Sequence, residues 1–379
     1  MKKYKICMIP AYPLENVQLL KDRVIIPYVC YRTFGESLTI VTRSTGDYPY
    51  LSYLEGIRME FLPENLPHME AAVEYIAAHS HEIDLLCLFG ARGEYIELAH
   101  TYKTVRPDGI IYMKLDANID WANAIPLFHA PYTDFLNHCD IISCEARRLQ
   151  AFLYKKWQRP IEYIPNGVYY PLYPEAEHVR CEEKENIILT VGRLGTAQKN
   201  SLLLLYAYAL TFIELEEPWE LVMVGNITPE FQADYDEFCR RFPPIAPYVH
   251  LTGNIAEKQT LYQYYKRAKI FALPSRLEGG SPNVFSEAAL FGCTVITTGV
   301  DAAPDMTDDG RVGRICWDTE DTEAFAKELL ALCRDQAYLE KNFYEMRTYM
   351  REFFDYERIA ERLHLLIDLQ SQKGGRYEN

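Results

Sequence analysis

The chain has 379 residues, 49% of them apolar, and a formal net charge of −15 at neutral pH. This length exceeds what one hydrophobic core usually spans, so we expect two domains, and the apolar content excludes bulk disorder. The negative charge argues against general nucleic-acid binding, and the ten cysteines and nine histidines form no C-x-x-C, H-E-x-x-H or other metal-ligand pattern, so we expect a reducing cytosol and no metal site.

The first predicted element is a short buried strand, Tyr4–Ile9. Pro10 and Pro13 end its apolar stretch too early for a signal peptide. The longest apolar run, 202–213, is also shorter than the roughly 20 residues of a membrane span. The sequence therefore predicts a cytoplasmic protein. Peripheral contact with the inner membrane face is expected only through the first half, since residues 1–170 carry a net charge of −3 and the remainder −12.

Short β-branched runs alternate with longer amphipathic stretches along the whole chain. Strands interleaved with helices predict βαβ units and a parallel sheet covered by helices on both faces. Two such series in succession predict two doubly wound, Rossmann-like α/β domains. The predicted strands are Tyr4–Ile9, Leu38–Val41, Ile57–Phe61, Asp84–Phe89, Ile110–Lys114, Asp140–Ser143 and Ile161–Ile164 in the first series, and Ile187–Val191, Leu221–Val224, Val249–Leu251, Ile270–Leu273, Thr294–Thr297 and Val312–Ile315 in the second.

The predicted domain boundary lies in a stretch of prolines, tyrosines and charges without periodicity. We expect a first domain over residues 1–170, a linker over 171–185 and a second domain over 186–350. Residues 351–379 are expected to form a C-terminal helix, with its pattern clearest over Tyr356–Leu369, followed by a tail.

The stretch after the strand Ile187–Val191 carries a first set of candidate functional residues. In an open parallel sheet, ligands bind beyond the carboxyl ends of the strands. Gly192 and Gly195 allow a tight turn, and Arg193 and Lys199 follow at a spacing of six residues. A guanidinium and an ammonium at a strand end suit a diphosphate. The alternative is a surface loop with solvated cations.

The stretch 273–292 carries a second set. The strand ends at Leu273, a loop of small residues follows, and a helix is predicted to begin near Pro282 or Asn283. Its N-terminal amides would favour a phosphate. Glu278 in the loop is placed to reach sugar hydroxyls, and Glu287 to accept hydrogen bonds from a ribose diol. The alternative is that both are helix-start carboxylates that stabilise the helix dipole.

Five motifs together resemble the family-4 retaining glycosyltransferases of the GT-B fold, of the bacterial surface-polysaccharide or glycolipid type. They are V-G-R-L-…-K-N over 191–200, L-P-S-R-L-E-G-G-S-P-N-V-F-S-E-A-A over 273–289, I-P-N-G-V over 164–168, L-V-M-V-G over 221–225 and V-H-L-T-G over 249–253. The resemblance covers 187–298 almost completely. It implies two Rossmann-like domains facing a central cleft, with the C-terminal helix crossing back to the first domain.

The resemblance also implies roles for single residues. Arg193 and Lys199 would grip the diphosphate of a nucleotide sugar and stabilise the charge that develops as it leaves. Glu287 would hold the ribose hydroxyls, and Glu278 would bind the sugar. The implied donor-binding set is Gly192, Arg193, Lys199, Gly253, Asn254, Glu278, Gly279, Gly280, Ser281, Asn283, Val284 and Glu287.

The implied reaction is transfer of a hexose, with a UDP-sugar favoured, to a glycan or lipid-linked acceptor. Members retain anomeric configuration, by a front-face route in which the departing phosphate deprotonates the acceptor. This implies neither a protein nucleophile nor a metal or other cofactor, in agreement with the absence of a D-x-D motif after a strand. Backbone near Gly253 and Asn254 would contact the base.

Two features depart from the family pattern. Eight residues separate Glu278 from Glu287, where members usually have seven, with Ser281 as a candidate for the extra residue. The loop 9–16 also lacks the glycines that commonly let backbone approach the diphosphate.

The acceptor side is expected in the first domain. Asp116 follows the strand Ile110–Lys114, where many members have a histidine, and is a candidate catalytic or acceptor-binding residue; the alternative is a helix cap. The stretch 90–94 (G-A-R-G-E) is a second candidate. Basic and aromatic residues over 147–159 would suit an anionic membrane surface, or simply a solvated helix face.

Three other functions are compatible with the same fold. A nucleotide-sugar epimerase or hydrolase would need a general base, for which no carboxylate–histidine pair is evident. A non-catalytic nucleotide-sugar-binding protein would not need all four charged residues of the predicted donor site, which are Arg193, Lys199, Glu278 and Glu287. An NAD-dependent oxidoreductase is disfavoured because G-x-G-x-x-G is missing.

Overall fold

The computed structural model describes residues 2–374, which form two compact α/β units. The first unit contains the chain up to Leu172 and the C-terminal segment from Asp355, and the second contains Tyr173–Phe354. The segment predicted as a linker, 171–185, contains short 3-10 helices. The 3-10 helices are Asn16–Gln18, Pro49–Tyr53, Ser80–Glu82, Gly93–Tyr95, Tyr170–Leu172, Pro174–His178, Cys181–Glu183 and Ala246–Tyr248.

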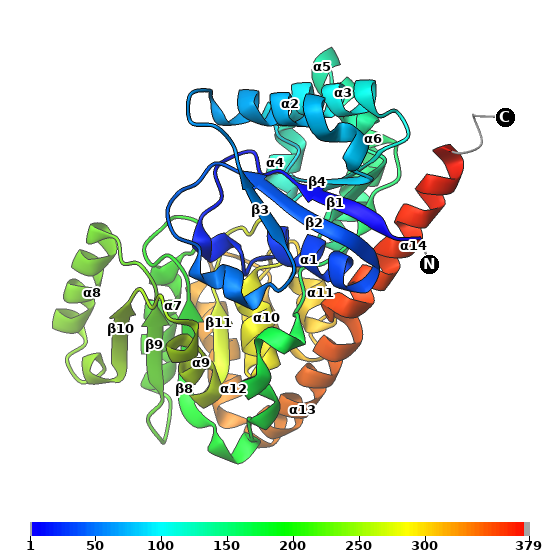
Figure 1. Ribbon diagram of the computed structural model, residues 1–379. Helices are drawn as coiled ribbons and strands as arrows, with labels where there is room; N and C mark the ends of the chain where they lie inside the picture. Colours follow the sequence, from blue (N-terminus) through cyan, green and yellow to red (C-terminus); the bar gives the residue numbers. More distant parts are fainter. Residues whose placement is uncertain (1, 375–379) are drawn as a thin grey trace. The chain divides into compact units, whose positions relative to one another are not determined.

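A seven-stranded parallel sheet with the order β3-β2-β1-β4-β5-β6-β7 forms the centre of the first unit. Figure 1 labels its strands β1 to β4. All five residues of β4 and of β5 are buried, as expected for central strands covered on both faces. The strands are β1 (Tyr4–Met8), β2 (Gly35–Thr42), β3 (Arg58–Phe61), β4 (Leu85–Phe89), β5 (Ile110–Lys114), β6 (Ile141–Cys144) and β7 (Glu162–Tyr163).

The C-terminal helix belongs to the first unit. Its His364 ring stacks on Phe34 with the ring centroids 4.3 Å apart, and Tyr4 donates a hydrogen bond of 2.6 Å to Asp368. These contacts join the helix to α1 and to the first strand. The helices of this unit are α1 (Asp22–Phe34), α2 (His68–His79), α3 (Ile96–Val105), α4 (Ile119–Ala124), α5 (Ala130–His138), α6 (Arg147–Trp157) and α14 (Tyr356–Gly374).

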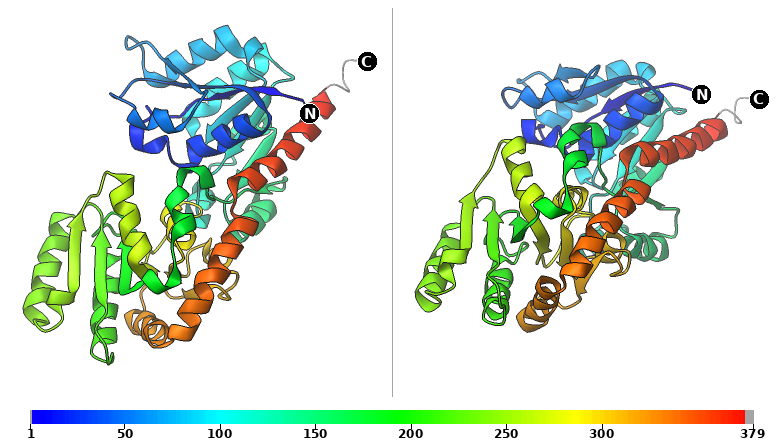
Figure 2. Two further views of the ribbon diagram at one scale, coloured as in Figure 1. Left: turned by 60° about the horizontal axis from the view of Figure 1, so that its bottom comes forward. Right: turned by 90° about the horizontal axis from the view of Figure 1, so that it is seen from below.

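The second unit is built on a six-stranded parallel sheet with the order β10-β9-β8-β11-β12-β13. Helix α8 lies beside the edge strand β10 (Figures 1 and 2). Tyr235 of this helix donates a hydrogen bond of 3.0 Å to the carbonyl of Val249 in the strand. The elements are β8 (Glu185–Val191), α7 (Ser201–Phe212), β9 (Glu220–Val224), α8 (Pro229–Arg241), β10 (Val249–Gly253), α9 (Lys258–Arg267), β11 (Ala268–Leu273), α10 (Asn283–Leu290), β12 (Thr294–Thr298), α11 (Ala303–Thr307), β13 (Gly313–Cys316), α12 (Thr322–Arg334) and α13 (Gln336–Phe353).

Each of the predicted strands overlaps a strand of the structure, and α10 begins at Asn283 as predicted. The largest difference at a strand start is in β2, which begins at Gly35 and not at Leu38. Its first residues are only partly buried, so their apolar signal is weak. The fold is thus two doubly wound, Rossmann-like α/β units.

The strand orders place a topological switch point in each unit. The chain leaves the first strand of each series toward one side of the sheet and later returns to pair on the other side, so β1 lies next to β4 and β8 lies next to β11. Ligands of doubly wound sheets bind at such a point, at the carboxyl ends of the strands. In the second unit, the loops that follow Val191 and Leu273 meet there, with the Arg276 amide donating to the Gln198 carbonyl at 2.8 Å.

The backbone at position 225 approaches the Gly192 carbonyl, just after β8, so closely that this position requires glycine. Gly225 has a φ of +142°, and a Cβ atom there would lie 1.6 Å from the carbonyl oxygen of Gly192. We expect Gly225→Ala to lower the unfolding free energy by at least about 3 kcal/mol in urea denaturation. Gly46→Ala is the matched control, because Gly46 has a φ of +132° but nothing within 4 Å. Equal losses in both variants would show that the contact with Gly192 is unimportant.

Within residues 2–374, every helix is too short or too polar to span a bilayer.

Candidate functional site

The loop after β8 presents two cations at the switch point of the second unit. The amide of Gly192 donates to the Val224 carbonyl at 2.9 Å, which extends the strand pairing into the loop. Arg193 follows on the exposed side, and Lys199 stands just before α7. The fold therefore brings both predicted phosphate ligands to the carboxyl end of β8.

The loop after β11 supplies a buried carboxylate to the same place. Glu278 is 6% exposed, and its Oε1 lies 2.5 Å from the Nζ of Lys199. Ser275 Oγ also donates to Oε1 at 2.5 Å. A buried carboxylate is stable only when paired and hydrogen-bonded, and these contacts meet that need. The predicted alternative, a helix-start carboxylate, is wrong for Glu278, which precedes α10 and pairs across loops.

Gln198 joins the exposed cation to this pair. Its Oε1 accepts a hydrogen bond of 2.6 Å from Nη2 of Arg193, and its Nε2 donates to Oε2 of Glu278 at 3.3 Å. We call Arg193, Gln198, Lys199 and Glu278 the loop network. Gln198 is not among the residues predicted from the sequence, although its place between the two cations was a signal for it.

Arg276 braces the two loops against each other. Its amide donates to the Gln198 carbonyl at 2.8 Å, and its Nη1 donates to the Ala197 carbonyl at 2.7 Å. Its Nη2 also donates to Glu320 at 2.8 Å. Arg276 therefore orients the backbone that carries Lys199 and was not selected from the sequence.

Glu287 lies on α10 with partners of its own. It is 5% exposed; Lys258 of α9 approaches its Oε1 to 2.7 Å, and Tyr265 donates to its Oε2 at 3.1 Å. Burial, with the neighbouring Glu287 charge, raises the pKa of Tyr265 well above its usual value, so the phenol stays a donor. The sequence motifs predict that Arg193, Lys199, Glu278 and Glu287 form one set. The contacts join the first three through Gln198, while Glu287 is held by α9.

The remaining residues of the predicted set lie at the same edge of this parallel sheet. Gly253 ends β10, its carbonyl accepts from the Gly225 amide at 2.9 Å, and Asn254 follows it on the exposed side. The loop before α10 passes through Gly280 with a φ of +69°. The other predicted residues here are Gly279 and Ser281 in the loop and Asn283 and Val284 in the first turn of α10.

In the first unit, Asp116 lies at the carboxyl end of β5, beside the buried ion pair of Lys114 and Glu145. Its φ is +48°, its amide donates to Oε1 of Glu145 at 3.0 Å, and Arg23 approaches its carboxylate to 3.6 Å. The predicted alternative, a helix cap, is wrong: Asn118 caps α4 by accepting from the Trp121 amide.

Burial, together with the charges of Asp22 and Glu145, raises the pKa of Asp116 to about 7, against the opposing effect of Arg23. Near neutral pH this carboxyl group is therefore partly protonated, and it can donate as well as accept a hydrogen bond.

The raised pKa predicts a pH-dependent stability. The pKa of Asp116 is about 7 in the folded protein and 3.8 in the unfolded chain, so the folded protein binds the proton more tightly. The resulting contribution to the free energy of unfolding is complete below pH 4 and is lost as the pH rises to about 7. Asp116→Asn cannot ionise. We expect the free energy of unfolding of this variant, relative to that of the native protein, to rise by about 1–2 kcal/mol between pH 4 and pH 7. The effect is this small because the Asp116 side chain is partly exposed and solvent screens its charge. Parallel pH profiles in urea denaturation would contradict the raised pKa.

The second candidate stretch of the first unit, 90–94, follows β4 at the other switch point. Tyr12 donates to Glu94 at 2.5 Å, and the guanidinium of Arg92 lies 5.2 Å from the centre of the Tyr12 ring. The hydrogen bond from Tyr12 holds the pKa of Glu94 below its usual value. The stretch thus forms a polar cluster with the loop after β1.

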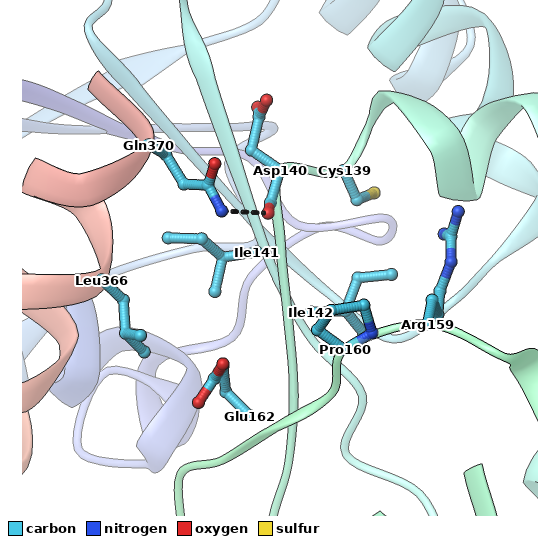
Figure 3. Close-up of a pocket in the computed structure, with 9 residues that line it drawn as sticks. All are labelled: Cys139, Asp140, Ile141, Ile142, Arg159, Pro160, Glu162, Leu366 and Gln370. Carbon is cyan, nitrogen blue, oxygen red and sulfur yellow. Dashed lines mark hydrogen bonds between the residues drawn. The ribbon is translucent and has the colours of Figure 1, made fainter. Parts of the chain in front are cut away.

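A cavity of about 180 Å³ in the first unit lies at the amino ends of the strands, away from their carboxyl ends. Asp140 and Ile141 line it where β6 begins, and Gln370 of α14 donates to the Asp140 carbonyl at 3.2 Å (Figure 3). Because ligands of such sheets bind at the carboxyl ends of the strands, we do not place the candidate site there.

Comparisons with known proteins bear on the second unit and on the fold. Residues 185–335, which include the loop network and α10, match the family described as "Glycosyl transferases group 1". No curated protein sequence matches the chain.

Several solved structures resemble the whole chain. HepE of Anabaena in complex with UDP has 14% identity and a TM-score of 0.74, over 96% of this chain and 99% of that one. Sucrose-phosphate synthase from Thermosynechococcus elongatus has 16% identity and a TM-score of 0.70, over 97% and 99%. A glycosyltransferase from Rickettsia africae has 15% identity and a TM-score of 0.69, over 98% and 99%. The chain has the GT-B fold, and within it residues 185–335 are similar to the glycosyl transferases of group 1.

Proposed function

We propose that the protein is a retaining glycosyltransferase of family 4 that transfers a hexose from a UDP-sugar to a glycan or lipid-linked acceptor. The observation that carries this proposal is the loop network at the switch point of the second unit. Two cations and a buried carboxylate lie where a doubly wound sheet binds its ligand. The group 1 match spans these same residues.

The loop network supplies the groups that a sugar diphosphate needs. Arg193 and Lys199 bind the diphosphate and stabilise its growing charge as the glycosidic bond breaks. Glu278, fixed by Ser275, accepts hydrogen bonds from the sugar. The amides at the start of α10 add donors for phosphate oxygens.

The nucleoside is expected at Glu287 and at the end of β10. The carboxylate of Glu287, held in place by Lys258 and Tyr265, accepts hydrogen bonds from the ribose diol. Backbone at Gly253 and Asn254 contacts the base. HepE has been crystallised with UDP and with UDP-glucose, which favours uridine as the base in our proposal.

The reaction follows a front-face route. The leaving phosphate oxygen takes the proton of the acceptor hydroxyl as the new bond forms on the same face, so configuration is retained and neither metal nor protein nucleophile is required. On the acceptor side we propose Asp116, whose carboxyl group donates or accepts a hydrogen bond near neutral pH. The setting we propose is assembly of a bacterial surface polysaccharide or glycolipid.

The test is release of UDP from UDP-glucose and UDP-galactose, with and without a panel of sugar and lipid-linked acceptors, and NMR of the product's anomeric centre. Acceptor-dependent release with a retained α linkage is expected. A new nucleotide sugar formed without acceptor would identify an epimerase, and acceptor-independent release a hydrolase. Tight UDP binding without turnover across the panel would identify a binding protein.

Peripheral membrane contact is proposed for the first unit. The side chains of Arg148, Tyr154 and Lys155 on α6 are exposed, and Phe128 in the loop before α5 is 95% exposed. Lys156 of α6 binds the Asn123 carbonyl at the end of α4, so these segments are neighbours. Basic and aromatic side chains together suit an anionic lipid surface.

We expect sedimentation with vesicles containing about 30% phosphatidylglycerol, a fraction chosen to give a strongly negative surface, and not with pure phosphatidylcholine. Arg148→Glu combined with Lys155→Glu should abolish it. Lys341→Glu, at an exposed lysine paired with Glu345 in the second unit, is the control. Equal sedimentation of all variants would contradict this contact.

A further inference from the structure

Three potential metal ligands meet on two helices of the first unit. His100 lies on α3, and Asp134 and His138 lie on α5. One ligand atom from each residue lies within 4.8 Å of the ligand atoms of the other two. The sequence shows no metal-ligand pattern here because His100 is distant in sequence from the other two residues. Only the packing of α3 against α5 brings them together.

The geometry of the cluster suits a first-row transition metal ion. Asp134 and His138 are one helical turn apart on α5, with Oδ2 and Nε2 separated by 3.2 Å. The rings of His100 and His138 have their centroids 5.7 Å apart. A bound zinc ion lies about 2.0–2.2 Å from nitrogen or oxygen ligands, which sets the ligand atoms roughly 3–3.5 Å apart. One pair already meets this, and His100 and Asp134 are exposed enough to rotate.

His138 provides a second observation. Its Nε2 atom is buried, and it makes no hydrogen bond of acceptable geometry with any described residue, although Asp134 is near. Buried polar atoms are usually satisfied by a protein group, by water or by an ion. A simple ion pair along α5 would account for Asp134 and His138 but would not explain why His100 converges on them.

We propose that His100, Asp134 and His138 bind one divalent transition metal ion of the zinc class and thereby cross-link α3 to α5. Two imidazoles and one carboxylate form a ligand set that such ions prefer over Mg²⁺ or Ca²⁺, and water completes the coordination. His138 ends α5 and lies shortly before Ile141, where β6 begins, so it is near the amino ends of the strands, whereas Asp116 follows the carboxyl end of β5. The site is structural and is independent of the proposed transfer reaction.

The test uses the full chain after treatment with EDTA and dialysis. We expect Zn²⁺ to bind with 1:1 stoichiometry in calorimetry and to raise the melting temperature, since a ligand that binds only the folded state stabilises it. His100→Ala and His138→Ala should each weaken binding by at least about tenfold, in line with the loss of one of three ligands. His81→Ala is the matched control, because His81 is an exposed histidine of the same unit that pairs with Glu82. Circular dichroism checks that each variant folds.

Cobalt distinguishes this site from binding by cysteine. Co²⁺ bound by nitrogen and oxygen ligands gives visible d–d bands without the strong near-ultraviolet band of a thiolate–cobalt bond. The partly exposed thiols are Cys181 and Cys239, and changing both to serine should leave binding unaltered. Three results would each overturn the proposal: a thiolate band, equal affinity of the His100 and His81 variants, or no binding at about 100-micromolar Zn²⁺. A dissociation constant of that size corresponds to a binding free energy of about 5.5 kcal/mol, which is weak for a metal site.

Discussion

Arg193→Ala is expected to reduce sugar transfer by about 100- to 1,000-fold, as removal of one preorganised donor to a developing negative charge does in other enzymes. Arg193 is exposed, and its Gln198 partner keeps its contact with Glu278, so the fold should be unaffected. The measurement is kcat/KM for UDP release with acceptor. Because the diphosphate gains charge as it leaves, the loss should fall mainly on kcat.

Lys199→Ala is expected to cause a similar loss of transfer together with a loss of stability. Lys199 is the cation that pairs with the Oε1 of buried Glu278, so its removal leaves that charge to Ser275 and Gln198 alone. Comparing this variant with Arg193→Ala separates binding of the diphosphate from support of the loop.

Arg240→Ala supplies the control for both variants. Arg240 is an exposed arginine of α8 in the same unit, paired with Glu237 one turn away, and its removal should leave transfer within twofold of the native rate. Native turnover in both the Arg193 and Lys199 variants would refute the assignment of the donor site.

The second large effect concerns the buried ion pair beneath Asp116. Lys114 and Glu145 have fully buried side chains, with Nζ and Oε1 2.7 Å apart, and Lys114 also donates to the Ile164 carbonyl at 2.9 Å. We expect Lys114→Met to lower the unfolding free energy by about 3–5 kcal/mol, because it leaves a buried carboxylate without its counter-charge.

The double variant Lys114→Met, Glu145→Leu tests the cause. Removing both charges should cost less than the sum of the two single variants, since no unpaired buried charge is left. Urea denaturation, followed by circular dichroism, measures each. Strict additivity would mean that the two residues act through packing and not through their charges.

The strands and their order along the chain follow from local sequence. The central strand Leu85–Phe89 is a continuous apolar run, and Ile110–Lys114 is apolar up to its last residue; a parallel sheet favours such runs because both of its faces are covered. The start of α10 was predictable to within one residue, although Pro282 stands at the N-cap and not in the first turn, which begins at Asn283. The positions of Arg193 and Lys199 after a strand were enough to select them.

The partners of the selected residues were not predictable in the same way. Lys199 and Glu278 are 79 positions apart in sequence, and Glu287 binds two residues of a different helix. Asp116 was considered as a cap, a role that Asn118 fills.

Sequence by itself determined the alternation of strands and helices, the two doubly wound units and the loops in which the candidate residues lie, because hydrophobic periodicity and turn residues act over a few neighbours. The tertiary structure alone decided which side chains meet: Glu278 with Lys199, Glu287 with Lys258, and the ring of His100 with that of His138. Such contacts depend on strand order and helix packing, which place side chains together without regard to their separation along the chain.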